Sequence, residues 1–341
     1  MALLSPAASP FLEEIIRISQ QLTLKRFGKT IQLYIPLYLS NECTNFCVYC
    51  GFNHDNKIER HTLLRQEIKA EAIKIKEMGF EHLLLVTGEH KAKAGTDYLL
   101  SALEELKDQF AQISIEVQPL KEDEYKTLAD AGLNSVYIYQ ETYNEKNYNI
   151  YHPKGKKADY RNRLETPDRL GSAEIHKIGL GVLLGLEDWQ VDSFFTALHL
   201  RYLQKKYWKT KYSVSFPRLR PFEGSYQPNF NISDKELVQL ITAYRILDEN
   251  VELALSTRES AAFRDNVFPL GITTMSAGSS TEPGGYSEDH EYLEQFSVAD
   301  SRTPLQVKEA IEKRGFEAVW KNWDESLQSI SGLKNSHTSN K

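Results

Sequence analysis

Hydrophobic positions along the chain alternate between two spacings, and this alternation predicts a regular series of strands and helices. Short continuous apolar runs are typical of buried strands. Such runs occupy residues 31–39, 82–86, 113–117, 135–139, 179–186, 212–216, 251–255 and 272–276. Between most of them, apolar residues recur every three or four positions, which indicates amphipathic helices. These helices are expected at residues 65–78, 98–110, 122–131, from 166, 191–206 and 233–247.

Strands that are apolar along their whole length, joined by helices, indicate a parallel sheet covered by helices. About eight such units predict an α/β protein with a closed (β/α)8 TIM-type barrel, and an open doubly wound sheet is the alternative. A further helix over residues 11–24, ended by Gly28, precedes the barrel. We expect an N-terminal helical segment over 1–30, the barrel over 31–290, a C-terminal helical extension over 291–330 and a disordered tail over 331–341.

Composition narrows the class of protein. The hydrophobic fraction of 41% is enough for a large core, and no apolar run approaches the ~20 residues that span a bilayer. The first residues do not resemble a secretory signal, so we expect a cytoplasmic protein with no membrane partner. A net charge of -6 gives no general attraction to nucleic acids. The lysine-rich stretches at 154–157 and 205–206 are predicted to be solvated surface.

All three cysteines lie within residues 40–52, directly after the first predicted strand. Cys43, Cys47 and Cys50 have the spacing C-x3-C-x2-C. In a barrel, loops that follow strands carry the chemistry, and clustered cysteines without distant partners argue against a disulfide framework. A zinc site completed by His54 is one interpretation. A [4Fe-4S] cluster is the other, and it normally takes four thiolates, so three leave one iron open to a small molecule.

The cysteine triplet followed by Gly-Phe, after a first barrel strand, resembles the radical S-adenosylmethionine (SAM) enzymes. The resemblance implies that the methionine moiety of SAM occupies the open iron of a [4Fe-4S] cluster. An electron from the cluster then cleaves SAM to methionine and a 5'-deoxyadenosyl radical. Tyr49, within the Cys-Val-Tyr-Cys sequence, matches the aromatic position that contacts adenine in this family.

Four further elements match SAM-binding positions of the family. Thr87, Gly88 and Glu89 resemble the Gly-Gly-Glu element whose backbone receives the SAM amino group. Glu141 stands where the family places an acid on the SAM ribose, and Arg163 where some relatives hold the SAM carboxylate. A surface ion pair is the alternative for these two residues. Gly185 resembles a glycine that lets the fifth strand pass the adenine, and close helix–strand packing is its alternative.

Residues 24–52, 216–221, 255–259 and 275–285 are similar to the aromatic amino acid lyases, and most to the 2-iminoacetate synthase family of thiamine thiazole synthesis. The resemblance implies that the radical takes a hydrogen from the amino group of L-tyrosine. The Cα–Cβ bond then breaks, giving 2-iminoacetate (dehydroglycine) and p-cresol. No cysteine remains for the second cluster of lipoyl or biotin synthase. A lyase for another aromatic amino acid such as tryptophan is the alternative.

A related tryptophan lyase uses an arginine and a serine to bind the substrate carboxylate. By this resemblance, Arg258 is expected to pair with the substrate carboxylate and Ser276 to add a hydrogen bond. Ser279 and Ser280 are alternatives for this serine. Arg218 and Arg220 are left open between a substrate role and a structural one.

The resemblance also implies two protein partners. A thiazole synthase would consume the unstable dehydroglycine, and the acidic segment over 286–294 is a candidate for that contact. Flavodoxin or ferredoxin would supply the electron. A scaffold or binding protein remains the alternative to an enzyme.

Overall fold

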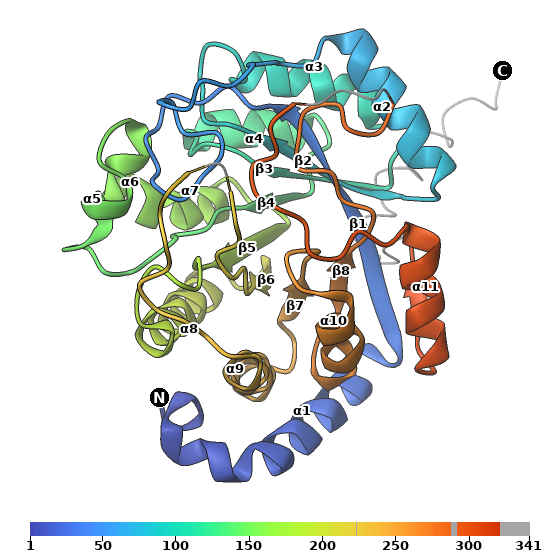
Figure 1. The fold of residues 1–341 in the computed structure, drawn as a ribbon. Helices are drawn as coiled ribbons and strands as arrows, with labels where there is room; N and C mark the ends of the chain where they lie inside the picture. Colours follow the sequence, from blue (N-terminus) through green and yellow to red (C-terminus); the bar gives the residue numbers. More distant parts are fainter. Residues whose placement is uncertain (223, 288–291, 321–341) are drawn as a thin grey trace, which may run out of the picture.

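A computed structural model describes residues 1–222, 224–287 and 292–320, and within them eight parallel strands close into a barrel surrounded by helices (Figure 1). The strands follow one another in sequence order around the sheet, and pairing of the second strand with the first closes it. They are β1 (Thr30–Ser40), β2 (His82–Thr87), β3 (Gln112–Glu116), β4 (Ser135–Tyr137), β5 (Lys177–Gly181), β6 (Lys211–Ser215), β7 (Glu252–Leu255) and β8 (Thr274–Ser276). The predicted (β/α)8 barrel is therefore confirmed, and the open sheet is excluded.

Helices cover the outside of the barrel. They are α2 (Arg65–Glu77), α3 (Thr96–Leu106), α4 (Glu122–Asp130), α7 (Thr166–Ser172), α8 (Trp189–Lys206), α9 (Asp234–Leu247) and α10 (Ala261–Val267). The short helices α5 (Tyr148–Tyr151), η3 (Lys156–Ala158) and α6 (Tyr160–Leu164) lie between β4 and α7, and η4 (Phe268–Leu270) follows α10. The large hydrophobic core lies between the outward side chains of the strands and these helices. Among the described residues, none of the helices is both long and apolar enough to cross a membrane.

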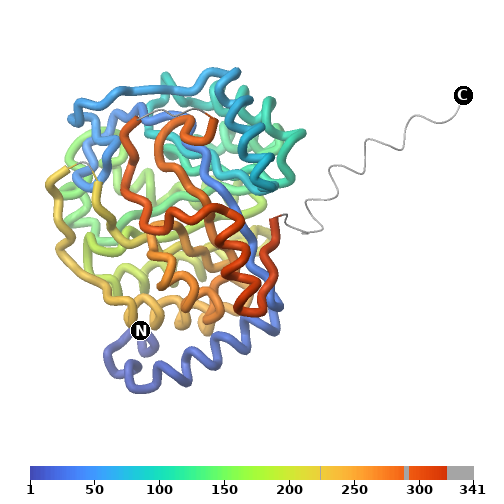
Figure 2. Tube along the Cα trace, turned by 45° about the vertical axis from the view of Figure 1, so that its right-hand side comes forward, coloured from blue at the N-terminus to red at the C-terminus, as the bar shows by residue number. Residues whose placement is uncertain are grey.

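Both ends of the chain extend the barrel. At the N-terminus, η1 (Ala2–Leu4) and η2 (Pro6–Phe11) lead into α1 (Leu12–Phe27), which packs on α9 and ends at Gly28 with φ 66°. At the C-terminus, α11 (Pro304–Lys313) is followed by β9 (Glu317–Val319), which pairs with the start of β1. Figure 2 shows the red C-terminal trace beside the blue trace of β1. The sequence did not predict β9, because three residues are too few for a periodic pattern. The tail predicted over 331–341 lies outside the described residues.

The predicted strand over 179–186 differs most from the structure. β5 begins two residues earlier and ends at Gly181. Beyond it, Val182 and Leu184 form only isolated bridges, to Glu141 and Arg218, before a turn at Gly185, where φ is +122°. Residues 182–184 and Leu186 remain buried. The apolar run is therefore longer than the strand, because loop residues share the core.

Alternate residues of each strand point into the barrel. At the N-terminal ends of the strands these residues are polar and bonded to one another, as in the contacts of Gln32 with His82 and Gln112, both 3.2 Å. Toward the carboxyl ends lies a small apolar cluster formed by Tyr38, Phe52, Leu84, Val86 and Tyr137. The cavity described next begins at this cluster.

Candidate active site

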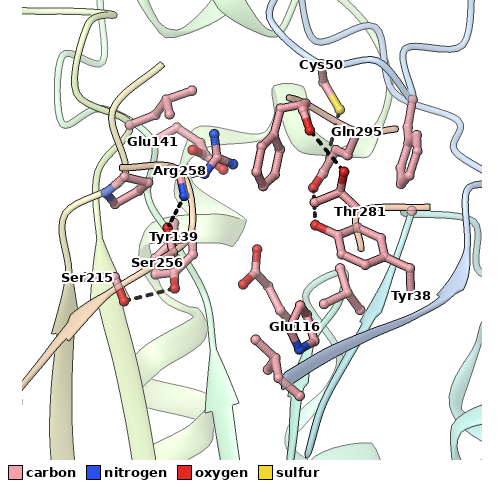
Figure 3. A pocket seen from close by; sticks show the side chains of 18 of the residues that line it. Tyr38, Cys50, Glu116, Tyr139, Glu141, Ser215, Ser256, Arg258, Thr281 and Gln295 are labelled. Carbon is pink, nitrogen blue, oxygen red and sulfur yellow. Dashed lines mark hydrogen bonds between the residues drawn. The ribbon is translucent and has the colours of Figure 1, made fainter. Parts of the chain in front are cut away.

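A single cavity at the carboxyl ends of the strands collects most of the side chains singled out from the sequence (Figure 3). It is lined by Cys43, Cys47, Tyr49, Cys50, Thr87, Gly88, Glu89, Glu141, Arg163, Arg258 and Ser276. Gly185 is absent from this lining, and Leu183 contributes from the same loop instead. Cys43 and Ser276, which are 233 positions apart in the chain, thus meet at one face of the barrel, as the TIM architecture requires.

The loop that carries the cysteines is fixed by backbone hydrogen bonds to its surroundings. The N–H groups of Thr44, Val48 and Gly51 donate to the carbonyls of Glu89, Tyr151 and Gln295, each at 3.1 Å. The Arg60 guanidinium also donates to four carbonyl oxygens, those of Asn41, Phe52, Asn53 and Asn56. The positions of the three thiols therefore follow from the protein fold.

The three thiols suit a cationic group. Burial raises the pKa of the Cys47 thiol well above its ordinary value, and it raises the pKa of Cys50 to about 11. Such thiols become thiolates when a metal supplies positive charge. Gln295 Nε2 already donates to Cys50 Sγ at 3.8 Å, the kind of hydrogen bond that tunes iron–sulfur clusters.

The zinc interpretation does not fit this geometry. A zinc ion needs four ligands around one point, so a zinc site here requires a fourth ligand beside the three thiols. His54 is exposed, is absent from the cavity lining and places Nδ1 at 3.1 Å from the Cys43 carbonyl oxygen. Thiols distributed around a cavity fit a [4Fe-4S] cluster, whose ligands bind different irons.

Next to the cysteines lies a group of four charged side chains, formed by Glu89, Glu141, Lys157 and Arg163. Arg163 donates to Glu89 at 2.8 Å and lies 3.5 Å from Glu141, and Lys157 Nζ donates to Glu141 at 2.7 Å. Their side chains are only 6–12% exposed. Glu141 and Arg163 are thus close partners as an ion-pair interpretation requires, but they line the cavity rather than the outer surface.

Electrostatics keep both acids of this group ionised. Burial would raise the pKa of Glu89 and of Glu141, but the positive charges of Arg163 and Lys157 outweigh it and hold both pKa values below the usual range. Glu141 also has φ 69°, a backbone conformation that non-glycine residues rarely adopt. Such strain commonly marks functional positions.

Lys157 corrects the expectation that residues 154–157 form a solvated patch. Lys154 and Lys156 are exposed, but Lys157 points into the cavity. Its backbone N–H donates to Asn45 Oδ1 at 2.9 Å, which draws η3 against the cysteine loop. Gly155 permits this approach, since a Cβ there would lie 2.3 Å from the same oxygen. Periodicity gives no signal for such an inward turn in a three-residue helix.

Tyr49 and the segment at the end of β2 are also fixed by close contacts with neighbouring residues. The Tyr49 hydroxyl lies 2.7 Å from His152 Nε2 in a buried contact. A Cβ on Gly88 would lie 2.3 Å from the Glu42 carbonyl oxygen, so only glycine fits there. Beside it, Thr87 Oγ1 is buried without a hydrogen-bond partner among the described residues. An unpaired hydroxyl at the cavity wall is consistent with a polar ligand.

Across the cavity, Arg258 is positioned by an aromatic ring and the serines differ in their contacts. The Arg258 guanidinium lies 3.3 Å from the centre of the Phe296 ring. Ser276 Oγ accepts from the backbone N–H of Thr257 at 3.0 Å. Ser279 also lines the cavity, and its Oγ is buried without a partner in the described structure. Ser280 is not part of the lining.

The two arginines that were left open are both paired with Glu259. Arg218 holds both carboxylate oxygens of Glu259 and also bonds Asp234, an arrangement that fixes the loop after β6. Arg220 donates to the same carboxylate at 2.7 Å and lines the cavity. Arg218 therefore has a structural role, whereas Arg220 is in contact with the site.

Glu116 is a cavity residue that the sequence analysis did not select. It ends β3, and Figure 3 shows its carboxylate pointing into the middle of the cavity. No hydrogen bond or ion pair joins it to another described side chain. Burial raises its pKa to about 7. The signal was the alternation of Gln112, Ser114 and Glu116 in a strand whose inward positions are polar.

Comparisons with known proteins identify relatives of the whole chain. The pattern of the radical SAM superfamily matches residues 37–198, and that of the biotin and thiamin synthesis associated domain matches residues 215–317. The 2-iminoacetate synthase of Escherichia coli (strain K12) is 55% identical over 328 residues, covering 96% of this chain and 87% of the relative. The 2-iminoacetate synthase of Salmonella typhimurium is 53% identical over the same shares. Among solved structures, the [FeFe]-hydrogenase maturase HydG superposes with a TM-score of 0.89 at 30% identity, covering 93% of this chain and 71% of that one.

Proposed function

The chain belongs to the 2-iminoacetate synthase family of radical SAM enzymes, and we propose that the cavity described above holds its cluster, its SAM and its substrate together. The enzyme is a carbon–carbon lyase that cleaves L-tyrosine to 2-iminoacetate and p-cresol, with SAM converted to methionine and 5'-deoxyadenosine. One observation carries the assignment of residues: three thiols, four paired charges and Arg258 line the same cavity.

Cys43, Cys47 and Cys50 would hold the [4Fe-4S] cluster. When bound, the cluster and SAM supply the 5'-deoxyadenosyl radical that starts the reaction. The protein's own contribution is to bury the thiols beside Lys157 and to donate a hydrogen bond from Gln295 to Cys50. The positive charge of Lys157 and the hydrogen bond from Gln295 favour the thiolate form that iron requires, and they oppose the effect of burial.

SAM would lie between the cysteine loop and the four charged side chains. Glu141 accepts hydrogen bonds well and suits the two ribose hydroxyls, and the Arg163 fork suits the carboxylate. The backbone of Thr87, Gly88 and Glu89 would receive the amino group, with Tyr49 beside the adenine. Leu183 lines the cavity where Gly185 was expected to pass the adenine, so the role of Gly185 in this proposal is to turn the loop that carries Leu183.

L-Tyrosine would bind with its carboxylate on Arg258. The Phe296 ring beneath the guanidinium limits the positions that Arg258 adopts, which lowers the entropy cost of binding. Ser276 or Ser279 would add a hydrogen bond, and the unpaired Oγ of Ser279 favours that residue. The apolar and phenolic walls suit an aromatic ring.

We extend the proposal to partners and location. Because the imine product is unstable, we expect a thiazole synthase to accept it directly. Because the cluster has a low potential, we expect flavodoxin or ferredoxin to reduce it. The acidic segment over 286–294 remains a candidate contact, although residues 288–291 lie outside the described part. An iron–sulfur cluster and unpaired thiols suit the cytoplasm, which is reducing.

The test is an anaerobic incubation of the iron–sulfide-reconstituted protein with SAM, dithionite and L-tyrosine, followed by quantification of 5'-deoxyadenosine and p-cresol. Both products in equal amounts are expected. L-Tryptophan in place of tyrosine serves as the control and is expected to give no methylindole-type product. Formation of 5'-deoxyadenosine without p-cresol would contradict the tyrosine assignment while leaving the SAM chemistry intact.

A further inference from the structure

Glu116 and Arg258 face the same cavity from opposite sides of the barrel. β3 and β7 are four strands apart in an eight-stranded ring, so residues at their ends lie across from each other. Figure 3 shows both side chains bordering the open space. Among the described residues no ion pair joins these opposite charges, yet Arg258 is the strongest charged influence on Glu116. The space between them is therefore bounded by one negative and one positive group.

The other groups around Glu116 do not neutralise it. The charged and phenolic side chains that act on it are Arg258, Glu141, Lys157, Arg163, Tyr34, Tyr38, Tyr137 and Tyr139. Lys157 and Arg163 are bonded to Glu141 and Glu89. The hydroxyls of Tyr38 and Tyr139 donate to Gln295 and to Ser215. In the described structure the Glu116 carboxylate therefore accepts no hydrogen bond. A buried acceptor of this kind at a cavity wall is expected to receive a hydrogen bond from a ligand.

We propose that Glu116 binds the ammonium group of the amino acid substrate and accepts a proton from it, while Arg258 holds the carboxylate. This inference rests on the proposed function, since it assumes an amino acid in the cavity. A zwitterionic amino acid carries its positive and negative charges on two groups bonded to the same carbon atom, which matches one anionic and one cationic wall. No other substrate group of L-tyrosine is positively charged.

The proton transfer explains why an acid is needed there. The lyase reaction begins at the substrate nitrogen, which must be a neutral amine to yield a hydrogen atom readily. The N–H bond pair stays on nitrogen, the proton moves to a Glu116 oxygen, and no oxidant or reductant takes part. A group that gains and loses a proton near neutral pH is suited to this role, and burial places the pKa of Glu116 at about 7.

The experiment compares ligand binding with and without an amino group, using the reconstituted enzyme with SAM but no reductant. L-Tyrosine and 3-(4-hydroxyphenyl)propanoate, which lacks the amino group, are titrated by anaerobic calorimetry into wild type and Glu116→Gln. A charge-assisted hydrogen bond is worth about tenfold or more in affinity. Wild type should therefore prefer tyrosine by roughly tenfold or more, and Glu116→Gln by less than about threefold.

The matched control is Glu122→Gln, an exposed glutamate at the start of α4, which should keep the wild-type preference. L-Phenylalanine tests the competing idea that Glu116 binds the phenol. If Glu116→Gln kept the preference for the amino group, or lost instead the preference for tyrosine over phenylalanine, the inference would be overturned.

A measurement on wild type alone gives an independent answer should the glutamine variant fold poorly. The preference for tyrosine should weaken as the pH falls from 8 to 6, because protonated Glu116 no longer attracts an ammonium group. A preference that stays constant across this range would contradict the inference. Because no turnover is involved, these results are distinct from a failure of the lyase assay, which would show as missing p-cresol from wild type.

Discussion

The side chains of the cavity act in pairs, so that a single change leaves a partner exposed to an unfavourable environment. Arg163 contacts Glu89, Glu141 and the Tyr139 carbonyl, the last at 2.5 Å. Lys157 completes the pairing of Glu141. Breaking a buried pair leaves an uncompensated charge, which costs more than the pair itself contributes. Substitutions here are therefore expected to lower the stability of the fold as well as the affinity for ligands.

Lys157→Met should weaken SAM binding about tenfold, because Glu141 would lose the partner that keeps it ionised and oriented. Equilibrium binding of SAM to the reconstituted protein measures this directly. Lys156→Met is the matched control, since its side chain points outward in the same short helix. Equal SAM affinity in the two variants would show that Lys157 has no part in the site.

Cys47→Ser should abolish the stable cluster, since two thiolates do not replace three in holding a cube of four irons. The iron and acid-labile sulfide of the reconstituted variant are expected to fall to background, together with 5'-deoxyadenosine formation. The circular dichroism spectrum should remain that of wild type, because the cysteine loop is fixed by backbone bonds. A full iron content in this variant would contradict the ligand assignment.

At the scale of elements, the C-terminal segment secures the end of β8. Arg264 of α10 and Asp300 form an ion pair with both side chains fully buried, and Arg264 also donates to the Ser276 carbonyl. The Arg302 guanidinium adds two further bonds to Asp300, at 2.8 and 2.9 Å. The position of a proposed substrate-binding serine thus depends on a segment beyond the barrel strands.

Asp300→Asn should lower the free energy of unfolding by about 3 kcal/mol, because it leaves the buried Arg264 charge without its counterion. Urea denaturation followed by circular dichroism measures the change. Asp265→Asn removes a partly exposed partner of Arg302 and should cost less than about 1 kcal/mol. Similar losses in both variants would mean that burial does not determine the value of these pairs.

The sequence predicted the elements of the barrel well because each strand and helix buries a local apolar pattern. It failed where tertiary contacts decide the conformation. β5 ends at Gly181 although the apolar run continues, and Lys157 turns inward although its neighbours are solvated. The cysteine triplet was recognisable because its ligand spacing is local. Glu116 was not, because its importance lies in the absence of a partner, and that becomes visible only when the barrel closes.

At the scale of the whole molecule, two acids work against the stability of the fold at neutral pH. Burial raises the pKa of Glu116 and of Asp192 to about 7. In the unfolded chain these groups ionise near pH 4. The folded state therefore holds more protons between about pH 4 and 7, and stability falls as the pH rises through this window. Glu89 and Glu141, whose pKa values are lowered, contribute stability that is lost only in acid.

Glu116→Gln should reduce the loss of stability that occurs as the pH rises. Between pH 5 and pH 8 the decrease in the free energy of unfolding should be about 2 kcal/mol smaller in the variant than in wild type, after allowance for the access of Glu116 to the cavity. Denaturant midpoints across that range provide the measurement. Glu122→Gln should reproduce the wild-type slope, and a Glu116→Gln slope equal to it would refute the expectation.

The split pairing of β1 has a consequence for how the protein is made. Its later residues pair with β2, nearby in the chain, but Gln32 pairs with Thr274 and Thr30 with Glu317. Contacts between residues so distant in sequence form slowly, since a long loop must close first. A ribosome has therefore released almost the whole polypeptide before the barrel becomes a ring. Until then one edge of the first strand has no partner strand. An unpaired strand edge can form hydrogen bonds with other chains, which promotes aggregation. The thiols that follow it are placed around a finished cavity only after synthesis has passed β8, so cluster insertion belongs to the completed chain.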